Sequence, residues 1–311
     1  MNFLISGAHI SPIYLISVGF IVGVLGGFFG VGGSFLAGPA LYAVGVPMNF
    51  VVGTDLAHIV GKSIVAARKH RALGNIDMKL GAIMVLGTIA GVEAGAQIIQ
   101  WLKRTAHIDI AVGVTFIVVL LGISGFMTWE SIKTLRLHGH GKATNKNRGR
   151  EHPSKREPSA AAHIARRIHA INLPPYISLP VSGVERVSVW AILIVAFVGG
   201  FFSGFLGGGA GYIRMPCLIY LLGIPTHIAV GTDLFEIIIS ASYGTITHAL
   251  KGNVDILIAL VMHTGAAIGA QIGATLTQFF GGARIRMAFI PLPIIGVIII
   301  IHGLLTGHSA K

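Results

Sequence analysis

The segment FFGVGGSFLAGP at residues 28–39 decides the fold, because a second version of it, FLGGGAGYIRMP, stands at residues 205–216. The motifs that follow also repeat in the same order, with VGTDL at 52–56 and 230–234 and H-x-x-x-G-N-x-D at 70–77 and 248–255. Two apolar halves that are each interrupted by glycine and proline at the corresponding place indicate the core of a transporter. We therefore expect two homologous repeats.

The composition places these repeats in a membrane. The 311 residues are 53% hydrophobic and only 11% charged, and the mean hydropathy is +0.79, values that exclude an ordinary soluble globular protein. Eight apolar stretches each have about the 20 residues that a bilayer requires, and they lie at 14–30, 50–67, 80–101, 108–129, 189–206, 228–247, 256–279 and 287–305. We predict an all-α integral membrane protein with about eight transmembrane helices, divided into four-helix repeats at 12–130 and 188–306.

The segment between the repeats, 131–187, is strongly basic. It holds eleven lysines and arginines against three acidic residues, and no aromatic residues interleave with these charges, which argues against nucleic-acid binding. Positively charged loops face the cytoplasm, so we predict a cytoplasmic linker that contacts anionic membrane lipids. From this anchor, a segment 12–46 that enters and leaves on one side gives inverted repeats, which we favour. A single crossing by that segment would make the repeats parallel.

The glycine runs Gly30–Ser34 and Gly207–Gly211 interrupt helices at mid-bilayer depth. Irregular backbone is tolerated there only where protein buries it or water fills a cavity. Successive free N–H groups can bind an anion, and a helix that restarts after the break points its positive end to the same place. The candidate anion-binding residues of the two runs are Gly32, Gly33, Ser34, Gly209 and Gly211. Simple helix packing through small residues is the alternative.

Arg214 is the strongest single candidate for a substrate-binding residue. It lies three residues past the second glycine run in otherwise apolar sequence, and an arginine at that depth is costly unless it faces a cavity and holds a partner. Its forked guanidinium suits an oxyanion. A salt bridge to Asp233 or Glu236 is the alternative.

The VGTDL motifs supply polar residues at matched places in both halves. Thr54 and Thr232 are candidates to complete the binding shell of an anion, while Asp55 and Asp233 are candidates for a gate or for proton coupling. The alternative is local: a threonine can cap a helix, and an aspartate in a first turn complements the helix dipole.

His70 and His248 occupy matched places where helices leave the membrane. Because histidine titrates near neutral pH, both are further candidates for a gate or for proton coupling, with a structural role beside the following Gly-Asn turn as the alternative. Lys62 has no counterpart in the other half, and we expect it to extend toward the membrane surface. No cluster in the sequence indicates a metal site or an organic cofactor.

Together these residues resemble the sulfite exporter TauE/SafE family of small bacterial permeases. The resemblance rests on residues 26–56 with the motif at 70–77 and on their echo at 199–235, and it covers essentially all the predicted helices. It implies a carrier with duplicated four-helix units that moves sulfite, sulfonates or related sulfur oxyanions. Ser34 stands where the family usually has a third consecutive glycine.

We therefore expect a bacterial inner-membrane exporter of sulfite or a close analogue, working by alternating access, and not an enzyme. A homodimer is compatible with this expectation. The main alternative is an uptake permease for organosulfonates with the same site. Two further alternatives are a passive anion channel and an intramembrane protease, the latter suggested by the string Gly122-Ile123-Ser124-Gly125.

Overall fold

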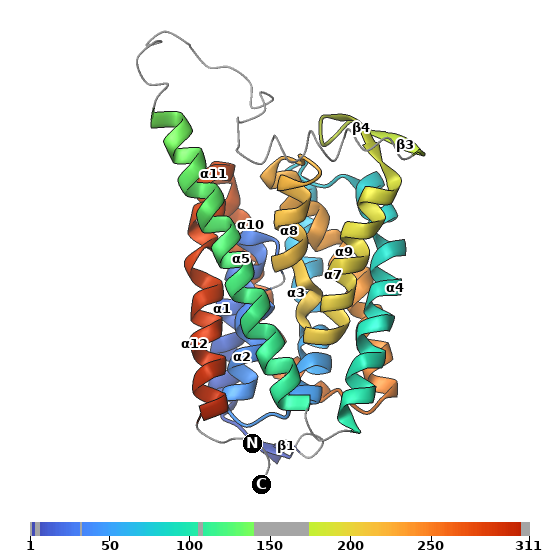
Figure 1. Cartoon of the computed structure of the whole chain (residues 1–311). Coiled ribbons are helices and arrows are strands. Elements are labelled where there is room, and N and C mark those ends of the chain that lie inside the picture. The colour runs from blue at the N-terminus through green and yellow to red at the C-terminus, as the bar shows by residue number, and fades with distance from the viewer. Residues whose placement is uncertain (1, 4–6, 32, 105–107, 140–173, 306–311) are drawn as a thin grey trace.

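The chain folds almost entirely into helices (Figure 1). The computed structural model describes residues 2–3, 7–31, 33–104, 108–139 and 174–305, so Gly32 and most of the predicted linker lie outside the described residues. The helices of the first half are α1 Pro12–Phe29, α2 Ser34–Ala43, α3 Met48–Ala72, α4 Met78–Lys103 and α5 Ile108–Gly139. Those of the second half are α7 Val189–Leu206, α8 Gly211–Tyr220, α9 Thr226–Leu250, α10 Ile256–Leu276, α11 Gly282–Phe289 and α12 Pro291–Leu305.

Two small antiparallel hairpins and two 3₁₀ turns complete the described part of the chain. β1 (Asn2–Phe3) pairs with β2 (Ala8–His9), and β3 (Tyr176–Leu179) pairs with β4 (Val184–Ser188). The 3₁₀ turns are η1 Gly208–Ala210 and η2 Thr277–Phe279. The β3–β4 hairpin is fastened to the start of α4, because Ser182 Oγ donates a 2.6 Å hydrogen bond to Asp77 Oδ2.

Apolar helices long enough to cross a bilayer make up most of the bundle. Within the described residues there are seven such stretches: Pro12–Phe29, Met48–Ala72, Met78–Lys103, Ile108–Glu130, Val189–Leu206, Ile256–Phe279 and Gly282–Gly303. The eighth predicted span, 228–247, lies in α9, a helix of 25 residues whose hydropathy is lowered by Asp233 and Glu236. Large apolar side chains such as Ile13 and Leu86 are 76% and 69% exposed on the outside, which fits contact with lipid. The fold is that of a multi-pass membrane protein.

The breaks predicted at both glycine runs are observed in the backbone. α1 ends before Gly30, with φ +72°, and α2 begins after Gly33, with φ +76°. In the second half α7 ends before Gly207, with φ +83°, and α8 begins after Ala210, which has a left-handed φ of +45°. Glycine adopts this conformation without the Cβ clash that other residues meet, so the run of glycines explains why each helix can stop and restart inside the bundle.

The chain runs through its two halves in opposite directions. In Figure 1 the N-terminal end of α1 lies at the lower end of the bundle, and α5 leaves the bundle at the upper end. α7 starts at the upper end beside β4, and α12 finishes at the lower end. This course of the chain is the one that inverted repeats require.

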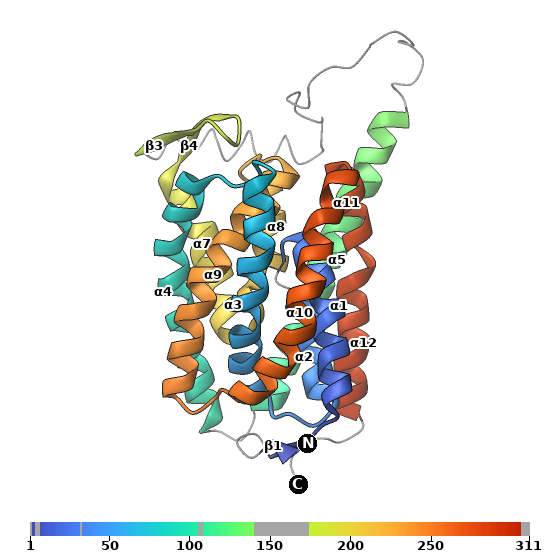
Figure 2. The same ribbon diagram turned by 180° about the vertical axis from the view of Figure 1, so that it is seen from behind.

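Helices of one half pack mainly on helices of the other. α1 packs along α10 and α4 along α7, while α3 and α9 contact each other between these pairs (Figures 1 and 2). Glycines allow the close approach: a Cβ on Gly91 would lie 2.2 Å from the backbone oxygen of Phe197, and one on Gly269 would lie 2.2 Å from that of Phe20. Small residues at such crossings are the usual means of packing helices in a membrane.

Candidate functional site

The centre of the bundle holds a group of buried ionisable side chains. α3 contributes Asp55, His58 and Lys62, α9 contributes Asp233 and Glu236, and α8 contributes Arg214, and each is at most 1% exposed. Charged groups inside a membrane protein are costly, rare and typical of transport pathways. Asp55, Asp233 and Arg214 were predicted from the sequence, whereas His58 was not.

Arg214 pairs with two carboxylates of α9. Its Nε donates a 2.7 Å hydrogen bond to Asp233 Oδ1, and its Nη1 lies 2.5 Å from Glu236 Oε2. The alternative role expected for Arg214, a salt bridge within the protein, therefore describes this conformation. One cation facing two carboxylates leaves the cluster with excess negative charge. In the described part of the chain, Asp233 Oδ2, Glu236 Oε1 and Arg214 Nη2 have no hydrogen-bond partner.

Two glycines make room for this cluster. A Cβ on Gly199 of α7 would lie 2.1 Å from Cγ and 2.4 Å from Cδ of Arg214, so the arginine side chain crosses α7 where that helix has no side chain. A Cβ on Gly211 would lie 2.5 Å from Asp233 Oδ2 and 2.6 Å from the Cα of Val31. The start of α8 and the break after α1 thus meet beside the buried carboxylate. Gly211 was predicted from the sequence as a site residue, and Gly199 was not.

The other predicted glycines lie at the breaks without contacting Arg214. A Cβ on Gly33 would lie 2.5 Å from the backbone oxygen of Val22, and one on Gly209, where φ is +73°, would lie 3.2 Å from Ile237. Both residues are buried. Ser34 begins α2, and Gly32 lies outside the described residues.

The two threonines of the VGTDL motifs each hold a loop of the opposite half. The backbone N–H of Asp255 donates to Thr54 Oγ1, and that of Asp77 donates to Thr232 Oγ1, both at 2.9 Å. The interpretation of Thr54 and Asp55 as cap and first turn was wrong. α3 begins at Met48 and α9 at Thr226, each after a proline, so both VGTDL motifs lie inside helices.

The two predicted histidines also make matched contacts. His70 Nε2 lies 3.1 Å from the backbone oxygen of Gly27, and His248 Nε2 lies 2.9 Å from that of Gly204. A carbonyl oxygen only accepts, so in both residues Nε2 carries the proton that is donated. The contacts tie the ends of α3 and α9 to α1 and α7.

Lys62 lies elsewhere than expected. The sequence suggested that it extends toward the membrane surface, but its side chain is 1% exposed, so this prediction was wrong. In the described residues its Nζ has no hydrogen-bond partner. On the same helix, His58 Nδ1 lies 3.2 Å from Asp55 Oδ1.

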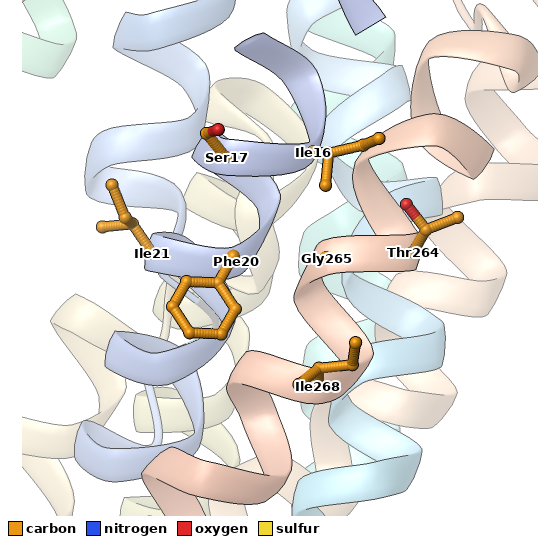
Figure 3. Close-up of a pocket in the computed structure, with 7 residues that line it drawn as sticks. All are labelled: Ile16, Ser17, Phe20, Ile21, Thr264, Gly265 and Ile268. Atoms are coloured by element: carbon orange, nitrogen blue, oxygen red, sulfur yellow. The ribbon is translucent and has the colours of Figure 1, made fainter. Parts of the chain in front are cut away.

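The groove in Figure 3 lies away from this centre. It has a volume of about 500 Å³ and runs between α1 and α10, and its lining is mainly apolar: Ile16, Ser17, Phe20, Ile21, Thr264, Gly265 and Ile268. None of the predicted site residues lines it, and its exposed isoleucines fit contact with lipid chains. Among the described residues, no group of three or more His, Cys, Asp or Glu side chains could hold a metal ion.

Buried ionisable residues inside a bundle of apolar, membrane-length helices are typical of membrane transport proteins. The chain belongs to the sulfite exporter TauE/SafE family, whose model matches residues 15–300. It is 25% identical over 303 residues to the probable membrane transporter protein YunE of Bacillus subtilis, with 94% of this chain and 99% of that protein covered. It is also 25% identical to a probable membrane transporter protein of Methanocaldococcus jannaschii, with 88% and 89% covered.

A shorter match covers part of a third relative. The chain is 30% identical over 113 residues to a probable membrane transporter protein of Xylella fastidiosa, a match that spans 36% of this chain and 43% of that protein. No solved structure has significant similarity to the chain. The family and its relatives indicate a membrane transporter and not an enzyme. Ser124, the residue that suggested a protease, donates its hydroxyl to the backbone oxygen of Ile290 at 3.1 Å.

Proposed function

We propose that this transporter exports sulfite, or a closely related sulfur oxyanion, across the bacterial inner membrane by alternating access. The description of its family as sulfite exporters supports the substrate class. The observation that carries the proposal is Arg214, a fully buried guanidinium at the centre of the bundle, positioned by α8 just after the glycine break. A guanidinium presents planar, paired donors that match an oxyanion.

The ion pairs of Arg214 suggest how an anion would be admitted. In the conformation described here Asp233 and Glu236 occupy the guanidinium, so an incoming oxyanion has to displace a carboxylate of like charge. A proton on either carboxylate would remove that competitor and free donors for the anion. We therefore propose that anion binding at Arg214 and protonation of the α9 carboxylates are linked, which couples transport to protons.

Alternating access follows if residues 12–130 and 188–306 are inverted repeats. The opposite course of the chain in the two halves supports this (Figure 1), as do the equal 2.9 Å contacts of Thr54 and Thr232 with the opposite loops. Motion of one repeat against the other would then expose the centre to each side in turn. The basic linker 131–187 would face the cytoplasm and its anionic lipids, and the proposal is compatible with a homodimer.

The test is sulfite efflux from liposomes that contain the purified protein, measured with and without a pH gradient. We expect saturable efflux that responds to the gradient and falls at least tenfold in Arg214→Gln. Arg68→Gln is the matched control, because Arg68 is an exposed arginine on α3 and its replacement should leave efflux unchanged. Wild-type efflux by Arg214→Gln would refute the role of Arg214.

Competing anions in the same liposomes separate the other transport functions. Transport of an organosulfonate without any sulfite flux would favour the uptake permease. Flux that does not saturate at modest concentration and ignores the pH gradient would favour a passive channel.

A further inference from the structure

Lys62 is a buried cation that has no role in the proposed mechanism. It lies in the middle of α3, its side chain is 1% exposed, and within the described residues its Nζ has no hydrogen-bond partner. An ammonium group has three donors, and burying it without partners is strongly unfavourable. A lysine kept in such a place is therefore expected to meet a ligand.

The residues around Lys62 carry other polar atoms that have no hydrogen-bond partner in the described part of the chain. Asp55, His58 and Lys62 are spaced i, i+3 and i+7, so they share one face of α3. Asp55 is the carboxylate whose charge acts on Lys62. Its Oδ1 lies 3.2 Å from His58 Nδ1, and its Oδ2 has no hydrogen-bond partner among the described residues. His58 Nε2 is buried and, among the described residues, has no partner.

A histidine of α10 completes this cluster. The ring of His263 lies against α3, where a Cβ on Gly61 would be 2.1 Å from its Cε1. His263 acts electrostatically on His58 and is acted on by Lys62, so the three side chains are close neighbours. The cluster thus combines one ammonium and two imidazoles with a single carboxylate.

The second half has a more negative set of side chains at the positions that match His58 and Lys62. There, 178 residues later, Glu236 stands in place of His58 and Ser240 in place of Lys62, and Ser240 Oγ lies 3.3 Å from Glu236 Oε2. Arg214 faces two carboxylates in that half, whereas Lys62 faces one that is shared with His58. The first half is therefore the less negative of the two and the more favourable for an anion.

We propose that Lys62, with His58 and His263, forms a second contact site for the transported oxyanion in the first half of the bundle. The inference rests on the proposed function, since it takes the ligand to be the same small oxyanion that Arg214 binds. Lys62 supplies the charge and three N–H donors. His58 and His263 each supply a further donor when the ring takes up a proton together with the anion. The anion would pass between a cationic site in each half as the halves move.

The experiment measures sulfite-dependent thermal stability and efflux for Lys62→Met and Lys62→Arg. Methionine matches the volume of lysine without its charge, so Lys62→Met should melt at a temperature equal to or above that of the ligand-free wild type. It should lose the rise in melting temperature that sulfite gives, and its KM for efflux should increase at least tenfold. Lys62→Arg, which keeps the charge, should retain part of both. Lys69→Met on the same helix is the matched control and should behave as the wild type.

The outcomes separate this inference from the proposed function. A wild type that responds to sulfite, together with Lys62→Met that responds equally and has the wild-type KM, overturns the second site alone. A ligand-free Lys62→Met that melts well below the wild type, with its sulfite response intact, assigns Lys62 a structural role and also overturns it. A wild type that shows neither stabilisation nor efflux with sulfite, thiosulfate or a sulfonate refutes the proposed function, and the second site with it.

Discussion

Gly199→Ala tests whether the position of Arg214 depends on a missing side chain in α7. The new methyl carbon would lie 2.1 Å from Cγ and 2.4 Å from Cδ of Arg214, whereas carbon atoms pack at about 3.5–4.0 Å. The arginine chain then has to move by roughly 1.5 Å, which breaks its 2.7 Å hydrogen bond to Asp233. Loss of one partner from a buried ion pair costs about 3–5 kcal/mol. Because the Glu236 contact can persist, we expect about 3 kcal/mol.

The assay combines thermal unfolding of the purified protein with efflux from liposomes. A loss of about 3 kcal/mol corresponds to roughly a hundredfold change in an equilibrium constant, so Gly199→Ala should melt at a clearly lower temperature and transport at least tenfold more slowly. Gly122→Ala is the control, since a Cβ there meets nothing within 4 Å. In Arg214→Ala, which lacks the Cγ and Cδ that the new methyl would meet, the same glycine change should have little further effect. A Gly199→Ala protein with wild-type melting and efflux would refute the reasoning.

Four further changes test the packing around the centre by thermal unfolding. Thr232→Ala removes the acceptor of the buried N–H of Asp77 and should lower stability by about 1–3 kcal/mol; an unchanged melting temperature would contradict this. Ala210→Gly relieves a left-handed backbone conformation that costs roughly 1–2 kcal/mol in a residue with a Cβ, so it should not lower stability. Gly33→Ala places a Cβ on a residue with a left-handed φ of +76°, so it should lower stability. Gly91→Ala places a methyl 2.2 Å from a backbone oxygen of α7 and should loosen the α4–α7 contact, a change that a fully wild-type melting curve would exclude.

Much of the fold could be predicted because helix length and apolar composition depend on local sequence. The predicted span 228–247 is the instructive exception. α9 is long and helical, yet it is not among the seven stretches that are apolar enough to span a membrane. Its Asp233 and Glu236 belong to the ionic centre, so the carboxylates that we propose for proton coupling are also those that lower the hydropathy of the helix.

The site was harder to predict because its geometry depends on contacts between helices far apart in sequence. Arg214 stood out as a lone charge in apolar sequence, and its partners were among the possibilities considered. Gly199 could not be recognised, because nothing local shows that an arginine crosses it. His58 could have been found by comparing the halves, since it occupies the place of Glu236.

The pairing of α1 with α10 has a consequence for biosynthesis. A ribosome that has just released α1, at Pro12–Phe29, still has about 230 residues to translate before Ile256 appears. At about 5–20 residues per second this takes roughly 11 to 46 seconds. During that time the glycine face of α1 lies in the membrane without its native neighbour. Chaperones or insertion factors that shield such a face would therefore act on the nascent chain well before the bundle can close.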